Sequence, residues 1–147
     1  MSGLLANLMQ GLQNQAERHR NRPFMEATMA ACALVATADG TVSFSERHRV
    51  DQILERLDQL RVFDPHEAIN LFDDFVEELK QSPEAGRTAA LERLAKIAED
   101  RDSSRLMVRI CCAVSEADGE FSAAERRQID EICRALGLTL EDSGLQT

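Results

Sequence analysis

An internal repeat constrains the fold of this chain more than any other feature of its sequence. Residues 28–57 align without gaps on residues 107–136, and eleven of the thirty aligned positions are identical. The identical pairs are Cys32/Cys111, Val35/Val114, Ala38/Ala117, Asp39/Asp118, Gly40/Gly119, Ser43/Ser122, Glu46/Glu125, Arg47/Arg126, Asp51/Asp130, Ile53/Ile132 and Leu57/Leu136. A solenoid needs about three or more repeats, whereas this chain has two. The repeat therefore predicts a bundle in which two helix–turn–helix units are related by a pseudo-two-fold axis.

The composition favours helix along the whole chain. The 147 residues include no Trp, no Tyr, seven Gly and three Pro, and β-branched runs are absent. A chain of this length is normally one domain. Because apolar residues recur at helical spacing in about seven segments, we predict an all-α, single-domain bundle of about seven helices.

The first predicted helix, about residues 3–19, carries an apolar stripe of Leu4, Leu5, Leu8, Met9 and Leu12. Pro23 is predicted to open a second helix over about 24–38, which divides the chain into an amphipathic helix (1–22) and a helical domain (23–147). We expect the stripe to pack on the protein's own core; a partner or a membrane surface is the alternative. The stripe is too short, and too interrupted by Asn and Gln, to span a membrane.

Start and stop signals place the later helices. Helix starts are predicted at Ser43, Asp64-Pro65, Ser82-Pro83, about Asp102, and Ser122. Asp39-Gly40 and Asp118-Gly119 are predicted to end the helices that precede them, since glycine adopts a positive φ without steric cost.

Charge and cysteine content limit the classes of function. The net charge of −9 argues against nucleic-acid binding, since Arg18 to Arg22 is the only basic cluster along the sequence. The four cysteines form no CxxC pair and lie among apolar residues, and no signal peptide precedes them. We therefore expect reduced, buried cysteines in a cytoplasmic protein.

Four acidic residues recur in both repeat units and form the candidate metal ligands: Asp39, Glu46, Asp118 and Glu125. The glutamates are also the expected acids of two capping boxes. The aspartates lie at helix C-termini, where the helix dipole disfavours negative charge. Either a turn hydrogen bond or a bound cation offsets that cost. Ligands that are carboxylates alone suit Ca²⁺, Mg²⁺ or Mn²⁺ better than zinc.

The two turns also resemble the second half of an EF-hand loop, with Asp39 to Glu46 and Asp118 to Glu125 matching its last eight positions. The first half is different, because Val35 and Val114 stand where the first ligand of an EF-hand belongs. This argues against a calmodulin-type calcium site.

The paired Ala-Asp-Gly…Ser-x-x-Glu segments, Ala38–Glu46 and Ala117–Glu125, resemble the TerB-like family. This family is known from tellurite-resistance proteins and from the N-terminal domain of DjlA-type co-chaperones. The resemblance covers roughly residues 24–138 and contains no J-domain His-Pro-Asp. It implies a cytoplasmic seven-helix bundle with acidic residues suspected of binding metal. It also implies a role in resistance to tellurite and related stress, in assemblies with protein partners that reach the inner membrane.

Three hypotheses for the function follow. The first is a non-enzymatic binding or scaffold protein in which the four acidic residues form one shared or two symmetric cation sites. The second is a purely structural interaction domain without metal, in which the repeat serves folding alone. The third is a carboxylate metalloenzyme, which the absence of Glu-x-x-His and of any visible nucleophile disfavours.

Overall fold

The computed structural model describes residues 2–117, 119, 121–139 and 141, and within them it contains helices and no strand. The helices are α1 (Ser2–Ala36), α2 (Phe44–Arg56), α3 (Asp58–Arg61), α4 (Pro65–Gln81), α5 (Pro83–Ala95), α6 (Arg101–Ser115) and α7 (Ala123–Ala135). The all-α, single-domain prediction is confirmed.

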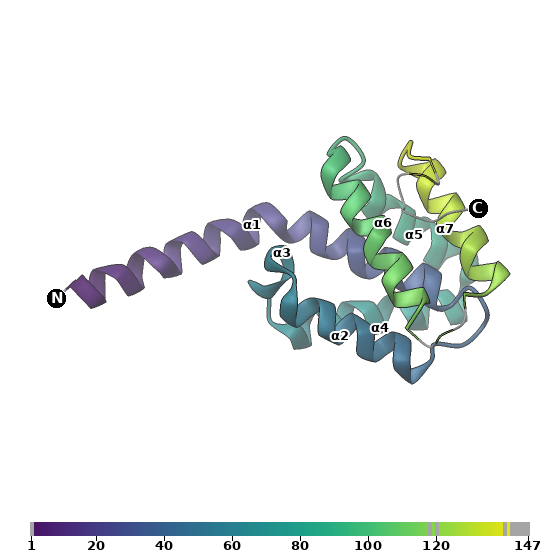
Figure 1. Cartoon of the computed structure of the whole chain (residues 1–147), viewed down its shortest axis with the longest axis horizontal. Helices are drawn as coiled ribbons and strands as arrows, with labels where there is room; N and C mark the ends of the chain where they lie inside the picture. The colour runs from purple at the N-terminus through teal and green to yellow at the C-terminus, as the bar shows by residue number, and fades with distance from the viewer. Residues whose placement is uncertain (1, 118, 120, 140, 142–147) are drawn as a thin grey trace.

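The second half of α1 is the centre of the bundle. From Phe24 to Ala36 every residue is buried apart from Glu26, which is partly buried. A helix that is apolar on all sides needs neighbours on all sides. Helices α3, α4, α5, α6 and α7 all contact α1, and Figure 1 shows its second half running through the middle of them.

The first half of α1 corrects two predictions. We expected a helix boundary at Pro23, but α1 runs through Pro23 without a break. Proline removes one hydrogen-bond donor, and the good helix formers on both sides propagate the helix past it. We also expected the leucine stripe to pack on the core, but Leu4, Leu5, Leu8, Met9 and Leu12 are 54–75% exposed. Figure 1 shows this half extending away from the other helices, so no part of the bundle lies near enough to cover it.

Because the stripe makes no core contact, we expect Leu5→Ala and Leu8→Ala to change the free energy of unfolding by at most about 0.5 kcal/mol each. Leu54→Ala, which truncates a buried leucine of α2, is the matched comparison and should cost about 2–5 kcal/mol. Urea denaturation followed by circular dichroism measures both. If Leu5→Ala or Leu8→Ala lowered the free energy of unfolding as much as Leu54→Ala does, the stripe would be packed against other residues.

Most helix starts agree with the sequence signals. Ser43 and Ser122 are N-caps with complete capping boxes, and Asp64 caps α4 by accepting from the His66 N–H at 2.9 Å. Two boundaries differ. The third predicted helix is interrupted at Leu57, whose extended backbone separates α2 from α3, and α6 begins at Arg101 with Asp100 as its cap.

The two turns have the same backbone hydrogen bonds. The N–H groups of Thr37, Ala38 and Gly40 donate to the carbonyls of Ala33, Val35 and Thr37, and Glu116, Ala117 and Gly119 repeat this pattern 79 residues later. Gly40 and Gly119 both have positive φ, 99° and 81°. Each turn therefore delivers the chain to its capping box in the same way.

Candidate functional site

Two glutamates from the two repeat units form the candidate site. In each capping box the glutamate Oε1 accepts from the backbone N–H of the cap serine, at 3.0 Å for Glu46 and 3.2 Å for Glu125. Exposed capping-box glutamates are common, but these two side chains are 1% and 2% exposed. The hydrogen bond of the capping box thus holds Oε1 of each glutamate, and Oε2 lies in the interior.

The two carboxyl groups lie next to each other. Burial, and with it the carboxyl group of Glu125, raises the pKa of Glu46 from 4.5 to about 7, although its hydrogen bonds with Ser43 act in the opposite direction. Like charges in a poorly solvated site disfavour simultaneous ionisation. The Oε2 atoms of Glu46 and Glu125 are both buried without a hydrogen-bond partner. When both groups are ionised, no described donor reaches either oxygen, whereas a protonated Glu46 can share its proton with the adjacent Glu125.

A second pair of repeat-equivalent residues also meets. The neighbouring thiol of Cys32 and complete burial raise the pKa of Cys111 well above its ordinary value. Cys32 and Cys111 lie on α1 and α6, and Glu46 and Glu125 lie on α2 and α7. Both pairs therefore join equivalent positions of the two sequence repeats. All four cysteines are buried, as predicted, and none forms a disulfide.

The aspartates are placed differently from the glutamates. Asp39 is exposed, and its Oδ1 accepts from the Thr41 N–H at 3.3 Å, which is the turn hydrogen bond foreseen as one way to offset the helix dipole. Asp118 lies outside the described residues. Among the residues that are described, no three Asp, Glu, His or Cys side chains come close enough together to hold a metal ion. The structure thus brings together two of the four predicted ligands.

Residues 25–146 match the family described as tellurite resistance protein TerB. The chain belongs to the TerB family. The tellurium resistance protein TerB of Alcaligenes sp is 27% identical over 110 residues, which cover 75% of this chain and 90% of that protein. No solved structure matches the chain. The resemblance predicted from the paired turns is confirmed, and the family match leaves out the exposed leucine stripe of α1.

This TerB-family chain also has a basic cluster that was not predicted from its sequence. Arg49 and Arg56 of α2 lie with Arg109 of α6 around one groove, although the sequence indicated only the cluster Arg18 to Arg22. The seven-residue spacing of Arg49 and Arg56 puts them on one helix face, which the sequence does reveal. Arg109 is far away along the chain, and only the packing of α6 beside α2 brings it there.

Proposed function

We propose that this chain is a non-enzymatic binding module of the tellurite or related stress response, in which the buried glutamate pair takes part in holding a hard divalent cation. The observation that carries the proposal is the burial of two adjacent carboxyl groups, Glu46 and Glu125, whose Oε2 atoms no described donor reaches. Buried carboxylates are normally paired or bound to metal. The tellurite role is supported by the family and by the name of the Alcaligenes relative.

The donor chemistry fits the cation. Carboxylate oxygens are the preferred ligands of Ca²⁺, Mg²⁺ and Mn²⁺, and these ions complete their coordination with water. Glu46 and Glu125 would hold the ion, with Asp39 and Asp118 of the turns as the further candidates. A bound cation would supply positive charge beside the buried carboxyl groups and favour the ionised form of Glu46. Because the glutamates belong to α2 and α7, occupancy would also tie the two repeat units together.

The module acts through partners and in the cytoplasm, as we infer from its chemistry. Cysteines that form no disulfide, as in this structure, are typical of proteins in reducing compartments. In the described part of the chain no helix is both long and apolar enough to cross a membrane. Contact with membrane-bound stress-response assemblies would then be made through protein partners.

The decisive experiment measures the unfolding midpoint of chelator-treated protein with Ca²⁺, Mg²⁺ or Mn²⁺ added separately. An ion at about a hundred times its Kd stabilises the fold by about 2.7 kcal/mol. We expect this gain in the wild type and its loss in Glu46→Gln/Glu125→Gln and in Asp39→Asn/Asp118→Asn. Glu55→Gln, which neutralises an exposed glutamate of α2, is the control and should keep the gain.

A midpoint that none of these ions raises would refute the cation site. The purely structural interaction domain would then hold, in which both glutamates act only as caps worth about 1 kcal/mol each. The same variants, tested for survival of tellurite-treated cells, link the site to the stress response. If cells with the wild type and cells with Glu46→Gln/Glu125→Gln survived equally, the site would have no role in the tellurite response.

A further inference from the structure

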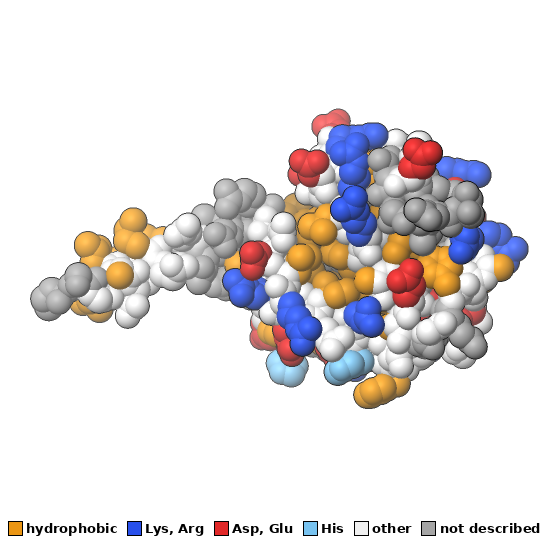
Figure 2. All heavy atoms as spheres, viewed as in Figure 1, with side chains coloured by type: hydrophobic (Ala, Val, Ile, Leu, Met, Phe, Trp, Pro, Cys, Tyr) orange, Lys and Arg blue, Asp and Glu red, His pale blue; other side chains and the backbone are white. Residues whose placement is uncertain are grey.

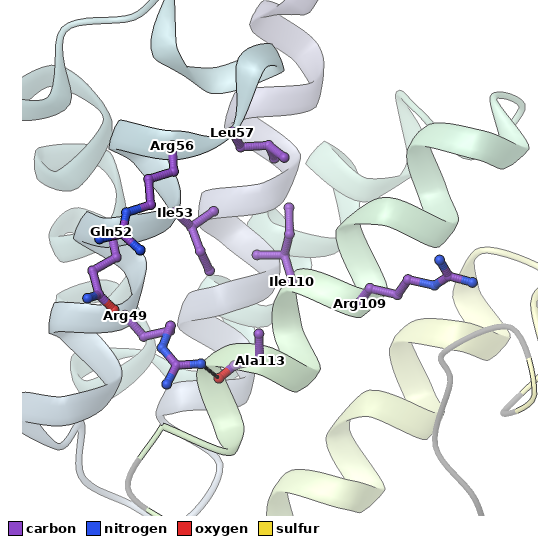
Figure 3. Close-up of a pocket in the computed structure, with 8 residues that line it drawn as sticks. All are labelled: Arg49, Gln52, Ile53, Arg56, Leu57, Arg109, Ile110 and Ala113. Carbon is purple, nitrogen blue, oxygen red and sulfur yellow. Dashed lines mark hydrogen bonds between the residues drawn. The ribbon is translucent and has the colours of Figure 1, made fainter.

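A groove between α2 and α6 has an apolar floor and a basic rim. It encloses about 530 Å³, with a floor that includes Ile53, Leu57 and Ile110 and a rim that carries Arg49, Arg56 and Arg109. Figure 2 shows hydrophobic side chains at the surface between these helices, with Lys or Arg side chains on both sides of them. In Figure 3, Arg49 and Arg56 rise from α2 on one side and Arg109 from α6 on the other. A concentration of positive charge stands out in a chain of net charge −9.

Two of these arginines have no acidic partner in the described part of the protein. Six other described arginines make ion pairs with carboxylates: Arg22, Arg47, Arg61, Arg87, Arg105 and Arg134. Arg56 and Arg109 make none with a described residue, and both are exposed. The Arg49 guanidinium donates to the Ala113 carbonyl at 3.2 Å, which joins α2 to α6 and leaves its other N–H groups available. The rim is therefore suited to receive anionic groups.

The internal repeat indicates that this groove lacks a covering element. Ile53 and Leu57 correspond to Ile132 and Leu136 in the second unit. Ile132 and Leu136 are 0% and 3% exposed, whereas Ile53 and Leu57 are only partly buried. Identical residues at equivalent positions are thus covered in one unit and open in the other.

Helix α5 lies against the equivalent pair of helices in the second unit. Under the repeat, α2 and α6 correspond to α7 and the second half of α1, and α5 contacts both of those. Arg87 of α5 donates to Gln128 Oε1 at 3.2 Å and pairs with Glu131. Gln128 and Glu131 occupy the positions of Arg49 and Gln52. Arg87 of α5 therefore meets one neutral and one acidic side chain there, whereas Arg49 of α2 occupies the position of Gln128 and faces no such helix in the described part of the chain.

We propose that the α2–α6 groove binds an acidic amphipathic helix of a partner protein, lying across α2 and α6 as α5 lies across α7 and α1. The apolar face of that helix would cover Ile53, Leu57 and Ile110. Its acidic residues would meet Arg49, Arg56 and Arg109. The 13 residues of α5 set the expected length of the contact. This interaction does not depend on the cation proposed above, because the groove contains neither glutamate of the pair.

The test uses a fluorescein-labelled synthetic peptide of about 14 residues, or about four helical turns, with leucines at spacings of three and four and glutamates beside them. Fluorescence anisotropy is measured with the full chain in chelator, so that the result is independent of any bound cation. We expect saturable binding that weakens with added salt, and no binding of the same peptide with lysine in place of glutamate.

Charge reversal on the rim identifies the site. Arg56→Glu and Arg109→Glu should each weaken binding about tenfold, since attraction becomes repulsion. Arg127→Glu makes the same charge change at an exposed position of α7 outside the groove and should have little effect. Circular dichroism confirms that all three variants are folded.

Three outcomes would overturn the proposal. One is that the peptide does not bind, or that all three substitutions weaken its binding equally. Another is binding of anionic phospholipid vesicles, but not of the peptide, through Arg56 and Arg109. The third is self-association of the chain that Arg56→Glu abolishes, which would make a second copy the occupant of the groove.

Discussion

In chelator at about pH 8, Glu46→Gln should be about 2 kcal/mol more stable than the wild type, and the advantage should shrink towards pH 5. The pKa of Glu46 is about 7 in the folded protein, against an ordinary value of 4.5, because of burial and the adjacent Glu125. The folded state therefore retains a proton that the unfolded chain releases between these two values. Its stability falls as pH rises through that window, since each pKa unit corresponds to about 1.4 kcal/mol.

Glutamine is the informative replacement at this position. Its carbonyl oxygen can still accept from the Ser43 N–H, so that the capping box is kept while ionisation is removed. Urea denaturation at several pH values gives the difference between variant and wild type directly. Glu55→Gln removes an exposed carboxylate from the same helix and should follow the wild type at every pH. A Glu46→Gln curve parallel to that of the wild type would show that Glu46 ionises normally in the fold.

This result also bears on the cation. An ion between the two carboxylates would cancel the wild type's loss of stability at high pH, whereas Glu46→Gln would gain little from it. Without the ion, Glu46→Gln would then be more stable than the wild type. Addition of the ion would stabilise the variant less than it stabilises the wild type. The response to the ion separates a binding site from a buried cap, because the stability of a buried cap would depend on pH and not on the ion.

Gly86→Val should cost about 3 kcal/mol, because it places a side chain between two helices that are in close contact. A Cβ at Gly86 would lie 3.0 Å from both the Cα and the N of Leu79 and 3.1 Å from the carbonyl carbon of Glu78. These are backbone atoms of α4, so α5 would have to move away from α4. Because α5 also covers α1 and α7, the displacement would open the core beside them.

The glycine's own helix propensity acts in the opposite direction. Replacing a helical glycine gains up to about 1 kcal/mol where nothing obstructs the new side chain. Gly11→Ala tests this in the exposed half of α1, where no atom lies within 4 Å of the added Cβ. We expect it to be neutral or slightly stabilising in urea denaturation. Equal effects of Gly86→Val and Gly11→Ala would show that α5 and α4 are not in close contact.

Local signals in the sequence were sufficient for much of the fold. Ser43 and Ser122 specify helix starts because a cap and its glutamate satisfy backbone groups within one turn. Gly40 and Gly119 specify the preceding turns through their positive φ. Such effects depend on residues within a few positions of one another, so they can be predicted without knowing how the chain packs.

Signals that depend on packing were incomplete or misleading. Pro23 predicts a break that the flanking helix overrides, and the stripe from Leu4 to Leu12 predicts core contacts that do not form. An apolar stripe shows that a face is suited to burial, and it does not show which surface covers it. The same limit applies to Ile53 and Leu57 of the α2–α6 groove, because the sequence shows that they are apolar and does not show what covers them.

The helical class, the two turns and the four candidate acidic residues could all be read from the sequence. The meeting of Glu46 and Glu125 in the interior, with Asp39 at the surface, follows from packing and could not be predicted. The two glutamates are far apart along the chain. Residues 79 positions apart can be brought together only by helices packing around the central half of α1, and that packing depends on the whole core at once.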